Sequence, residues 1–309
     1  MMISTMRRRP FRDIYLWVGI TGATTAGLTP LFVRESGIGP LACAAWRLGF
    51  AVLFLLPISL SCSLGNRQER KVEFSRRTIL LGVLFAGDVM LWQSSITLTN
   101  VGVAAFLANL APVFIVIYRA AFFHRIPGIL SGGAVTLATC GSYLLASPVL
   151  DLGGANALGA ALAVAASAVF AIFLMVSEVA PTPCNEIARY TGLTISAFPI
   201  VLVSALFLER QLGPTTVTGL AWLAGLAAIV HCLAFYLVFS SASSIGALSS
   251  SVVNLAQPVS AAIIGAVVYG EPLTLMTLVG MSCLAAAILL VAVDRRALLQ
   301  DDTFFKQVL

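Results

Sequence analysis

The chain of 309 residues is 59% hydrophobic and only 10% charged, with a mean hydropathy of +0.99. A soluble domain carries roughly 25% charged residues, so this sequence has too little polar surface to cover a globule in water, which excludes a soluble enzyme or binding protein. The net charge of +5 does not indicate nucleic-acid binding, because most of the basic residues lie in the short segments between apolar runs.

Apolar runs of the length that crosses a membrane fill most of the chain. A transmembrane β-barrel would instead alternate polar and apolar residues in roughly ten-residue segments, and the sequence does not. We therefore predict an all-α integral membrane protein with about ten spans and short loops. The predicted spans are 14–33, 40–63, 78–98, 101–123, 128–147, 156–177, 190–208, 217–240, 245–269 and 274–293. The first follows a basic segment but is too long for a signal-peptide core and lacks a cleavage site, so we expect it to be retained.

Lysine and arginine are divided unevenly between the two sets of loops. With both termini in the cytoplasm, only Arg34 and Arg210 lie in outer loops, while Arg47 and Arg119 lie within spans. The cytoplasmic segments hold the rest: Arg7, Arg8, Arg9, Arg12, Arg67, Arg70, Lys71, Arg76, Arg77, Arg125, Arg189, Arg295, Arg296 and Lys306. The positive-inside rule thus predicts cytoplasmic N- and C-termini, with the basic residues as topology signals and contacts to membrane lipids. We expect Arg119 to extend to the cytoplasmic interface.

A similar phrase occurs twice inside long apolar runs. NLAPVFIVIY begins at Asn109 and NLAQPVSAAI at Asn254, and Pro258 lies 146 residues after Pro112. Each proline is followed 13 residues later by a charged residue near the end of its run. The matched spacing indicates an internal repeat, in which the fourth and fifth spans correspond to the ninth and tenth.

An odd number of spans in each repeat fixes the geometry. We predict two five-helix repeats, residues 1–147 and 148–309, within one compact membrane domain. Because the first repeat starts inside and finishes outside, equivalent helices of the two repeats cross the membrane in opposite directions. Inverted repeats are common in secondary transporters, whose substrate site lies near the midplane between the repeats. Both halves are present in one chain, so we expect a functional monomer.

Several loose motifs also resemble those of a known family. They are the segment Pro40–Arg47 in GPLACAAWR, the helices with Pro112 and Pro258, and YGEPLT at Tyr269–Thr274. Over nearly its whole length the sequence resembles the ten-span EamA-type members of the drug/metabolite transporter superfamily, and among them the amino-acid exporters, including exporters of aromatic amino acids. The resemblance implies inverted five-helix repeats and export of small metabolites across the bacterial inner membrane.

The two repeats depart from each other at one place in this pattern. His124 and Arg125 in the first repeat stand where the second has Gly270 and Glu271. The difference fits the predicted sidedness, since the first pair falls inside and the second outside. It argues against a transport role for Glu271.

Ionisable residues within spans are costly and usually face a cavity, which makes Asp88 the first candidate site residue. It lies near the middle of the third span, with Trp92 one turn further along the same face. A carboxylate beside an aromatic ring suits an ammonium group, and a carboxylate at this depth could also couple transport to protons. A hydrogen-bonded structural aspartate and a packed tryptophan are the alternatives.

Two further charged or ionisable residues lie within spans. Arg47, in the second span, could bind a substrate carboxylate or could serve assembly by pairing with a carbonyl. His231, in the eighth span, corresponds in position to Asp88 and could carry a proton or remain a neutral, hydrogen-bonded side chain. Tyr236 lies nearby, as Trp92 does near Asp88, and we include it among the residues of the cavity.

The repeated phrase supplies the remaining candidates. Proline lacks the backbone donor and disrupts contact with the carbonyl one turn earlier, so we expect Pro112 and Pro258 to kink their helices. In lipid the freed carbonyl needs a partner, and the amides of Asn109, Asn254 and Gln257 could supply it or face the substrate. A packing kink without substrate contact is the alternative.

The sequence contains no catalytic constellation, phosphate-binding loop or metal-ligand spacing, so we expect no enzymatic activity, no cofactor and no metal. We predict a secondary transporter that exports amino acids or similar small amphipathic metabolites by alternating access. Its central cavity is expected between the first, third and fourth spans and the sixth, eighth and ninth. A passive channel or facilitator, or an exporter of drugs or other metabolites, is the alternative.

Overall fold

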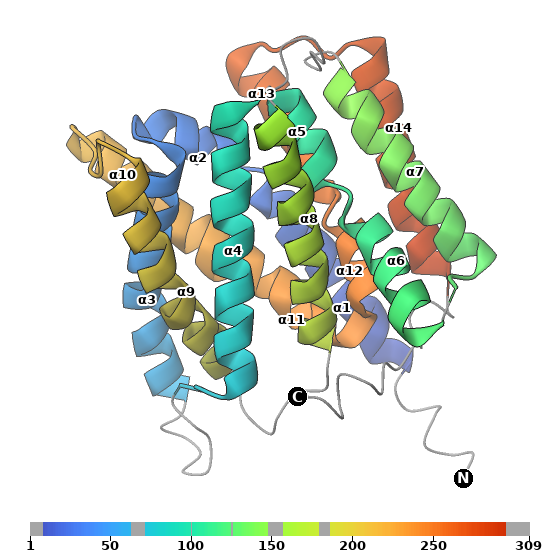
Figure 1. The fold of residues 1–309 in the computed structure, drawn as a ribbon, viewed down its shortest axis with the longest axis horizontal. Coiled ribbons are helices and arrows are strands. Elements are labelled where there is room, and N and C mark those ends of the chain that lie inside the picture. The colour runs from blue at the N-terminus through green and yellow to red at the C-terminus, as the bar shows by residue number, and fades with distance from the viewer. Residues whose placement is uncertain are drawn as a thin grey trace.

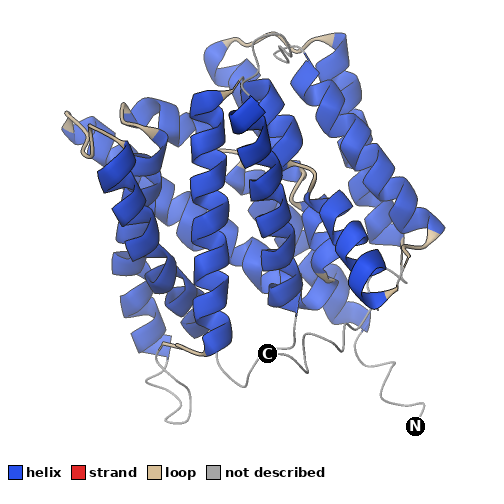
Figure 2. Cartoon of the chain, in the orientation of Figure 1, coloured by secondary structure: helices blue, strands red, loops and turns tan. Residues whose placement is uncertain are grey.

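The computed structural model describes residues 9–62, 72–99, 101–124, 126–147, 157–178 and 186–294. Within these ranges the chain is helical and has no strand (Figure 1, Figure 2). The helices are α1 (Arg9–Ala26), α2 (Thr29–Ser36), α3 (Pro40–Cys62), α4 (Arg76–Leu98), α5 (Val101–Ala108), α6 (Ala111–Phe123), α7 (Ile129–Ala146), α8 (Ala157–Glu178), α9 (Glu186–Leu208), α10 (Val217–Gly225), the π-helix η4 (Leu226–Phe235), α11 (Tyr236–Ile245), α12 (Ala247–Val253), α13 (Ala256–Tyr269) and α14 (Leu275–Val293).

These helices form ten spans that are long and apolar enough to cross a membrane, which confirms the predicted fold class. Four spans consist of successive pieces: α1–α2, α5–α6, α10–η4–α11 and α12–α13. The other six are single helices. Several predicted topology residues lie outside the described residues, as does position 148, where the second repeat was predicted to begin: Arg7, Arg8, Arg67, Arg70, Lys71, Arg125, Arg295, Arg296 and Lys306.

The packing of the helices repeats when the two halves are exchanged. Helix α4 packs on α8, and the matching spans of the other half, η4–α11 and α1, also pack together. The pair α4 and α9 corresponds to η4 and α3, and the contacts of α5 and α6 with α8 correspond to those of α12 and α13 with α1. Three further contacts join a span to its own counterpart in the other half: α3 with α9, α6 with α12, and α7 with α14. This arrangement is that of two inverted five-helix repeats.

Helices α7 and α14, the last spans of the two repeats, lie side by side at one edge of the molecule (Figure 1). They approach each other closely at two glycines. A Cβ atom on Gly141 would lie 2.9 Å from the carbonyl oxygen of Gly280, and one on Gly280 would lie 2.8 Å from the carbonyl oxygen of Gly141. Small residues at a membrane helix interface allow this backbone approach, which holds the two repeats together at this edge.

The fourth and ninth spans end in the same way despite their different sequences. The residue just after α6 is His124, with φ of 51°, and the residue just after α13 is Gly270, with φ of 67°. Both residues adopt the left-handed conformation that commonly closes a helix. The alignment of His124 with Gly270 therefore reflects a shared backbone geometry.

The same two spans are broken at the repeated phrase, at Asn109–Leu110 and Asn254–Leu255. The prolines lie just after the breaks, with Pro112 the second residue of α6 and Pro258 the third of α13. Backbone N–H groups in the first turn of a helix have no partner within the helix, so proline is tolerated there. The chain therefore breaks just before Pro112 and Pro258, and each proline lies in the first turn of a new helix instead of in the middle of a continuous one.

The asparagine and glutamine amides do not play the predicted part at these breaks. Among the described residues, no hydrogen bond joins the side chain of Asn109, Asn254 or Gln257 to the backbone, and the Asn254 Oδ1 atom is buried without a partner. The breaks are closed by short backbone turns instead, with Leu110 N–H donating to the Leu107 carbonyl at 3.3 Å. The first span has a similar break after Ala26 that the sequence analysis did not predict.

Candidate functional site

His231 lies at the centre of the molecule, in the π-helix η4, and its side chain is fully buried. Its Nε2 atom is 3.1 Å from the hydroxyl of Thr194, a hydrogen-bonding distance, while the hydroxyl of Tyr190 donates to the His231 carbonyl oxygen at 2.9 Å. The Tyr190 ring stacks on the imidazole with centroids 5.3 Å apart. A π-helical segment leaves backbone carbonyls differently placed from those of an α-helix, and such segments are frequent at functional sites.

Arg47 lies against two aromatic residues, Phe85 and Phe235, that also contact His231. Its guanidinium is 5.5 Å from the ring centroid of Phe235 and 6.0 Å from that of Phe85, and the residue is only 6% exposed. Its Nε atom has no hydrogen-bond partner among the described residues. Phe85 also meets His231 edge to face at 5.6 Å. The structure therefore brings Arg47 and His231, predicted separately, into one cluster.

Asp88 lies on α4 three residues after Phe85, on the face that this helix turns toward the cluster. Asp88 is half-buried and makes no hydrogen bond with any other described side chain. We call Arg47, Phe85, Asp88, Tyr190, His231 and Phe235 the central cluster.

The remaining predicted residues lie at different distances from the central cluster. Tyr236 is part of its edge, since its ring meets that of Tyr190 at 5.6 Å. Trp92 is half-buried one turn beyond Asp88 and has no ring contact with the described aromatic residues. No described contact joins the side chain of Asn109, Asn254 or Gln257 to the cluster. The second and seventh spans, absent from the predicted lining, contribute Arg47 and Tyr190.

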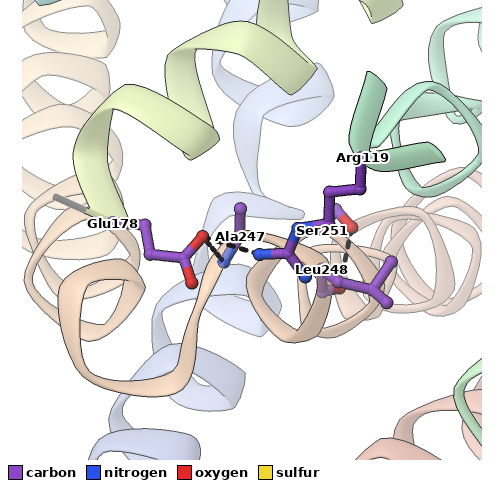
Figure 3. A network of polar contacts seen from close by, with 5 residues as sticks. All are labelled: Arg119, Glu178, Ala247, Leu248 and Ser251. Carbon is purple, nitrogen blue, oxygen red and sulfur yellow. Dashed lines mark hydrogen bonds and ion pairs between the residues drawn. The ribbon is translucent and has the colours of Figure 1, made fainter. Parts of the chain in front are cut away.

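A buried polar network lies near the ends of α6 and α8 that are predicted to be cytoplasmic (Figure 3). The Arg119 guanidinium of α6 donates to the Glu178 carboxylate of α8 at 2.8 Å, and the side chains are 4% and 14% exposed. The same carboxylate accepts the backbone N–H of Ala247, the first residue of α12, at 3.1 Å. The prediction that Arg119 extends to the cytoplasmic interface did not include this buried carboxylate partner from the other repeat. The network ties together α6, α8 and α12.

A second ion pair occupies the equivalent place at the opposite end. Arg34 of α2 and Glu271, just after α13, approach to 3.5 Å, but both side chains are 60% exposed. The Arg34 guanidinium lies 3.9 Å from the ring centroid of Tyr269, whose hydroxyl donates to Glu35 at 2.9 Å. Exposed pairs contribute about 0–1 kcal/mol, so this end is held less firmly than the end with the buried network.

Two more acidic residues join the seventh span to segments of the first repeat. Glu209, at the end of α9, accepts the backbone N–H groups of Leu41 and Ala42 at 2.7 and 2.8 Å, and so caps the start of α3. Glu73 lies 3.9 Å from Arg189 near the start of α9. Arg189, predicted to lie in a cytoplasmic segment, is instead a buried residue of α9.

The geometry defines a class of protein: a helical membrane protein with two inverted repeats and charged groups buried between them, the architecture of secondary transporters. The model of the EamA-like transporter family matches residues 13–147 and again 157–293. The chain belongs to this family.

Two further comparisons agree with this assignment. An uncharacterized transporter from Archaeoglobus fulgidus is 25% identical over 272 residues, which cover 88% of this chain and 93% of that protein. A protein of known crystal structure shares the fold with a TM-score of 0.77 at 14% identity, covering 92% of this chain and 99% of the other. The first supports a membrane transporter, and the second supports the fold alone.

Sequence reasoning missed Phe85, Tyr190, Thr194 and Glu178. Aromatic and hydroxyl residues are common in apolar spans, so nothing in the sequence distinguishes Tyr190 from a packing residue. Glu178 did carry a signal, since it is an acidic residue at the end of a span with no neighbouring base in the sequence. Its partner Arg119 lies 59 residues away in the other repeat.

Proposed function

We propose that this transporter exports amino acids, or metabolites of similar size and charge, by alternating access. The observation that carries the proposal is the buried Arg47 over the rings of Phe85 and Phe235, with Asp88 one helical turn after Phe85 on α4. An amino acid carries one carboxylate and one ammonium group, which match a guanidinium and a carboxylate respectively. Export is the direction that the resemblance to EamA-type exporters implies.

The aromatic members of the central cluster suit the rest of such a substrate. Phe85 and Phe235 offer ring faces to an ammonium group or to an apolar side chain. The Arg47 Nε atom, buried without a partner, supplies a free donor for a substrate carboxylate. A neutral apolar molecule would leave both charges without a partner, so the cluster favours substrates with opposite charges close together.

The two ends of the bundle support alternating access. Each end carries an ion pair between the fourth or ninth span of one repeat and the sixth or first span of the other. The buried pair Arg119–Glu178 favours a state closed at the predicted cytoplasmic end. The exposed pair Arg34–Glu271 needs little energy to break, so the opposite end opens first in this account.

The remaining features of the proposal follow from the sequence. We place the transporter in the bacterial inner membrane with both termini in the cytoplasm, and we expect it to work as a monomer. It contains no nucleotide-binding motif, so the substrate gradient or a proton gradient must supply the energy. Asp88, a carboxylate within the membrane, is the candidate for proton coupling.

Transport assays in proteoliposomes test this function. A panel of labelled amino acids, drugs and other metabolites is offered with and without a pH gradient. We expect saturable uptake of one or more amino acids, and we expect Asp88→Asn to lose transport or its dependence on the gradient. Transport of uncharged compounds alone would contradict the substrate class, and an Asp88→Asn variant with unchanged rate and unchanged pH response would remove Asp88 from the mechanism.

A further inference from the structure

A cavity of about 440 Å³ lies between α3 and α9, away from the central cluster. Trp46, Gly49 and Leu53 line it from α3, Phe198 and Leu202 line it from α9, and Leu212 lies in the loop that follows. Every side chain that lines it is apolar. The indole N–H of Trp46 already donates to the Leu212 carbonyl at 2.6 Å, so the tryptophan has no free polar atom for a ligand.

The cavity borders the surface that faces the membrane. Leu53 is 64% exposed, and the neighbouring Leu206 and Phe207 on α9 are 53% and 84% exposed. Large apolar side chains with such exposure in a ten-span membrane protein contact lipid. No side chain that lines the cavity offers a free polar group to water, and an empty space would lose the dispersion contacts of its walls. The surrounding hydrocarbon is therefore the chemistry that fits it.

The size of the cavity fits a single alkyl chain. Its lining on α3 extends from Ala42 to Leu53, a rise of about 16 Å, or roughly half of the hydrocarbon thickness. An alkyl chain about 5 Å thick and about 16 Å long fills roughly 300–400 Å³. A helix of the same length and about 10 Å in width would need roughly 1,200 Å³, which is too large.

A cationic side chain lies in the same loop as Leu212, which lines the cavity. Arg210 is exposed, is two residues before Leu212, and forms no ion pair with any other described residue. The adjacent Glu209 does not form an ion pair with it, since both Glu209 oxygens accept backbone N–H groups at the start of α3. Arginine binds phosphate groups well through its planar fork of donors. The charge complements a lipid headgroup above an acyl chain.

We propose that the seam between α3 and α9 binds one phospholipid, with an acyl chain in the cavity and the phosphate at Arg210. The lipid lies in the leaflet at the predicted outer side. Because α3 belongs to the first repeat and α9 to the second, the bound lipid contacts both moving halves. This site is separate from the central cluster and holds whether or not the transported substrate is an amino acid.

Fluorescence quenching tests the site in the full-length protein. A variant that keeps Trp46 alone, with Trp17, Trp92 and Trp222 changed to Phe, is reconstituted in bilayers with increasing fractions of brominated phosphatidylglycerol or phosphatidylcholine. We expect half-maximal quenching of Trp46 at a fraction of brominated lipid at least twofold lower than random exchange with the surrounding lipid would give. We expect brominated phosphatidylglycerol to quench more strongly than brominated phosphatidylcholine. Native mass spectrometry of the wild-type protein should show one retained phospholipid.

Two matched pairs of variants assign the groups. Leu202→Phe fills the cavity and should weaken quenching at least twofold, while Leu206→Phe, one turn away on the lipid face, should not. Arg210→Gln should abolish the preference for phosphatidylglycerol, while Arg34→Gln, the other outer arginine, should not. The proposal would be overturned if quenching of Trp46 matched that expected for random exchange of surrounding lipid and was the same in the Leu202→Phe variant. Protection of Trp46 together with a dimer would overturn it in favour of a second copy of the chain.

Discussion

At the scale of single residues, the molecule places opposite charges inside the membrane in two different settings. Arg119 forms an ion pair with Glu178 at 2.8 Å. Arg47 instead lies over the aromatic rings of Phe235 and Phe85, and no ion pair joins it to a described acidic residue. An incompletely satisfied charge at this depth is expensive, and such residues are usually functional. The contrast separates a residue that holds the fold from one that is available to a ligand.

Removal of the Arg47 charge should weaken substrate binding. A hydrogen bond to a charged group contributes about 1.5–3 kcal/mol, so we expect Arg47→Gln to raise the half-saturating concentration of an amino-acid substrate by roughly 10- to 100-fold. Arg47→Lys keeps the charge without the planar fork and should recover part of the loss. Initial rates of uptake into proteoliposomes measure both effects.

The control for this substitution is Arg76→Gln, which removes an exposed arginine at the start of α4. It should leave the half-saturating concentration unchanged. If Arg47→Gln transports as well as the wild-type protein while remaining folded, Arg47 has a structural role only.

Loss of the Glu178 carboxylate should loosen one end of the bundle. Glu178→Gln leaves Arg119 buried without its charge partner, and a break of this kind destabilises by about 3–5 kcal/mol. We therefore expect faster alkylation of a cysteine placed at Ser243, in the last turn of α11, in a background without the native cysteines. The matched change Glu271→Gln breaks an exposed pair at the other end and should not alter this rate. Equal alkylation of the two variants would argue against the buried network as a closure.

At the scale of the helices, the repeated Asn-Leu-Ala phrase marks the place where one helix ends and another begins. The break precedes each proline, so the proline serves as a first-turn residue of α6 or α13. A first-turn residue has no partner within the helix for its backbone N–H, so the missing N–H of proline costs no hydrogen bond there. Sequence alone suggested a kink because the apolar run continues through the break and conceals two helix ends.

Pro112→Ala distinguishes the two descriptions. A proline in the first turn of a helix costs little, so its replacement should change the free energy of unfolding by less than about 1 kcal/mol. A proline inside a continuous helix costs about 3 kcal/mol, and its removal should then stabilise the protein markedly. Thermal unfolding of the purified protein in detergent measures the difference.

Gly246→Ala should have a much larger effect than Pro112→Ala. Gly246 alone joins α11 to α12, and its φ of 84° with ψ of 157° is a conformation that essentially only glycine adopts. A side chain there costs about 1–3 kcal/mol, so we expect a clearly lower unfolding temperature. A variant as stable as the wild-type protein would show that the turn can adopt another conformation.

At the scale of the whole molecule, the apolar runs were sufficient to predict the ten spans, because a membrane helix must be long and apolar whatever its neighbours. The spacing of the repeated phrase and the odd number of spans in each repeat then predicted the inverted repeats. Arg47, Asp88 and His231 could be selected because ionisable residues are rare in such runs. Their assembly with Tyr190 could not, since that depends on how α3, α4, α9 and η4 pack. The ion pair of Arg119 with Glu178 could not be predicted for the same reason, because its partner is on a helix of the other repeat.

The central claim is that two inverted repeats expose one amino-acid site to each side of the membrane in turn. Counterflow in proteoliposomes tests it most directly: vesicles loaded with an unlabelled amino acid are diluted into a trace of the labelled one. We predict transient accumulation of label above its external concentration in the wild-type protein, and none in Arg47→Gln. Equilibration without accumulation, at a rate independent of the internal amino acid, would contradict alternating access and indicate a passive channel.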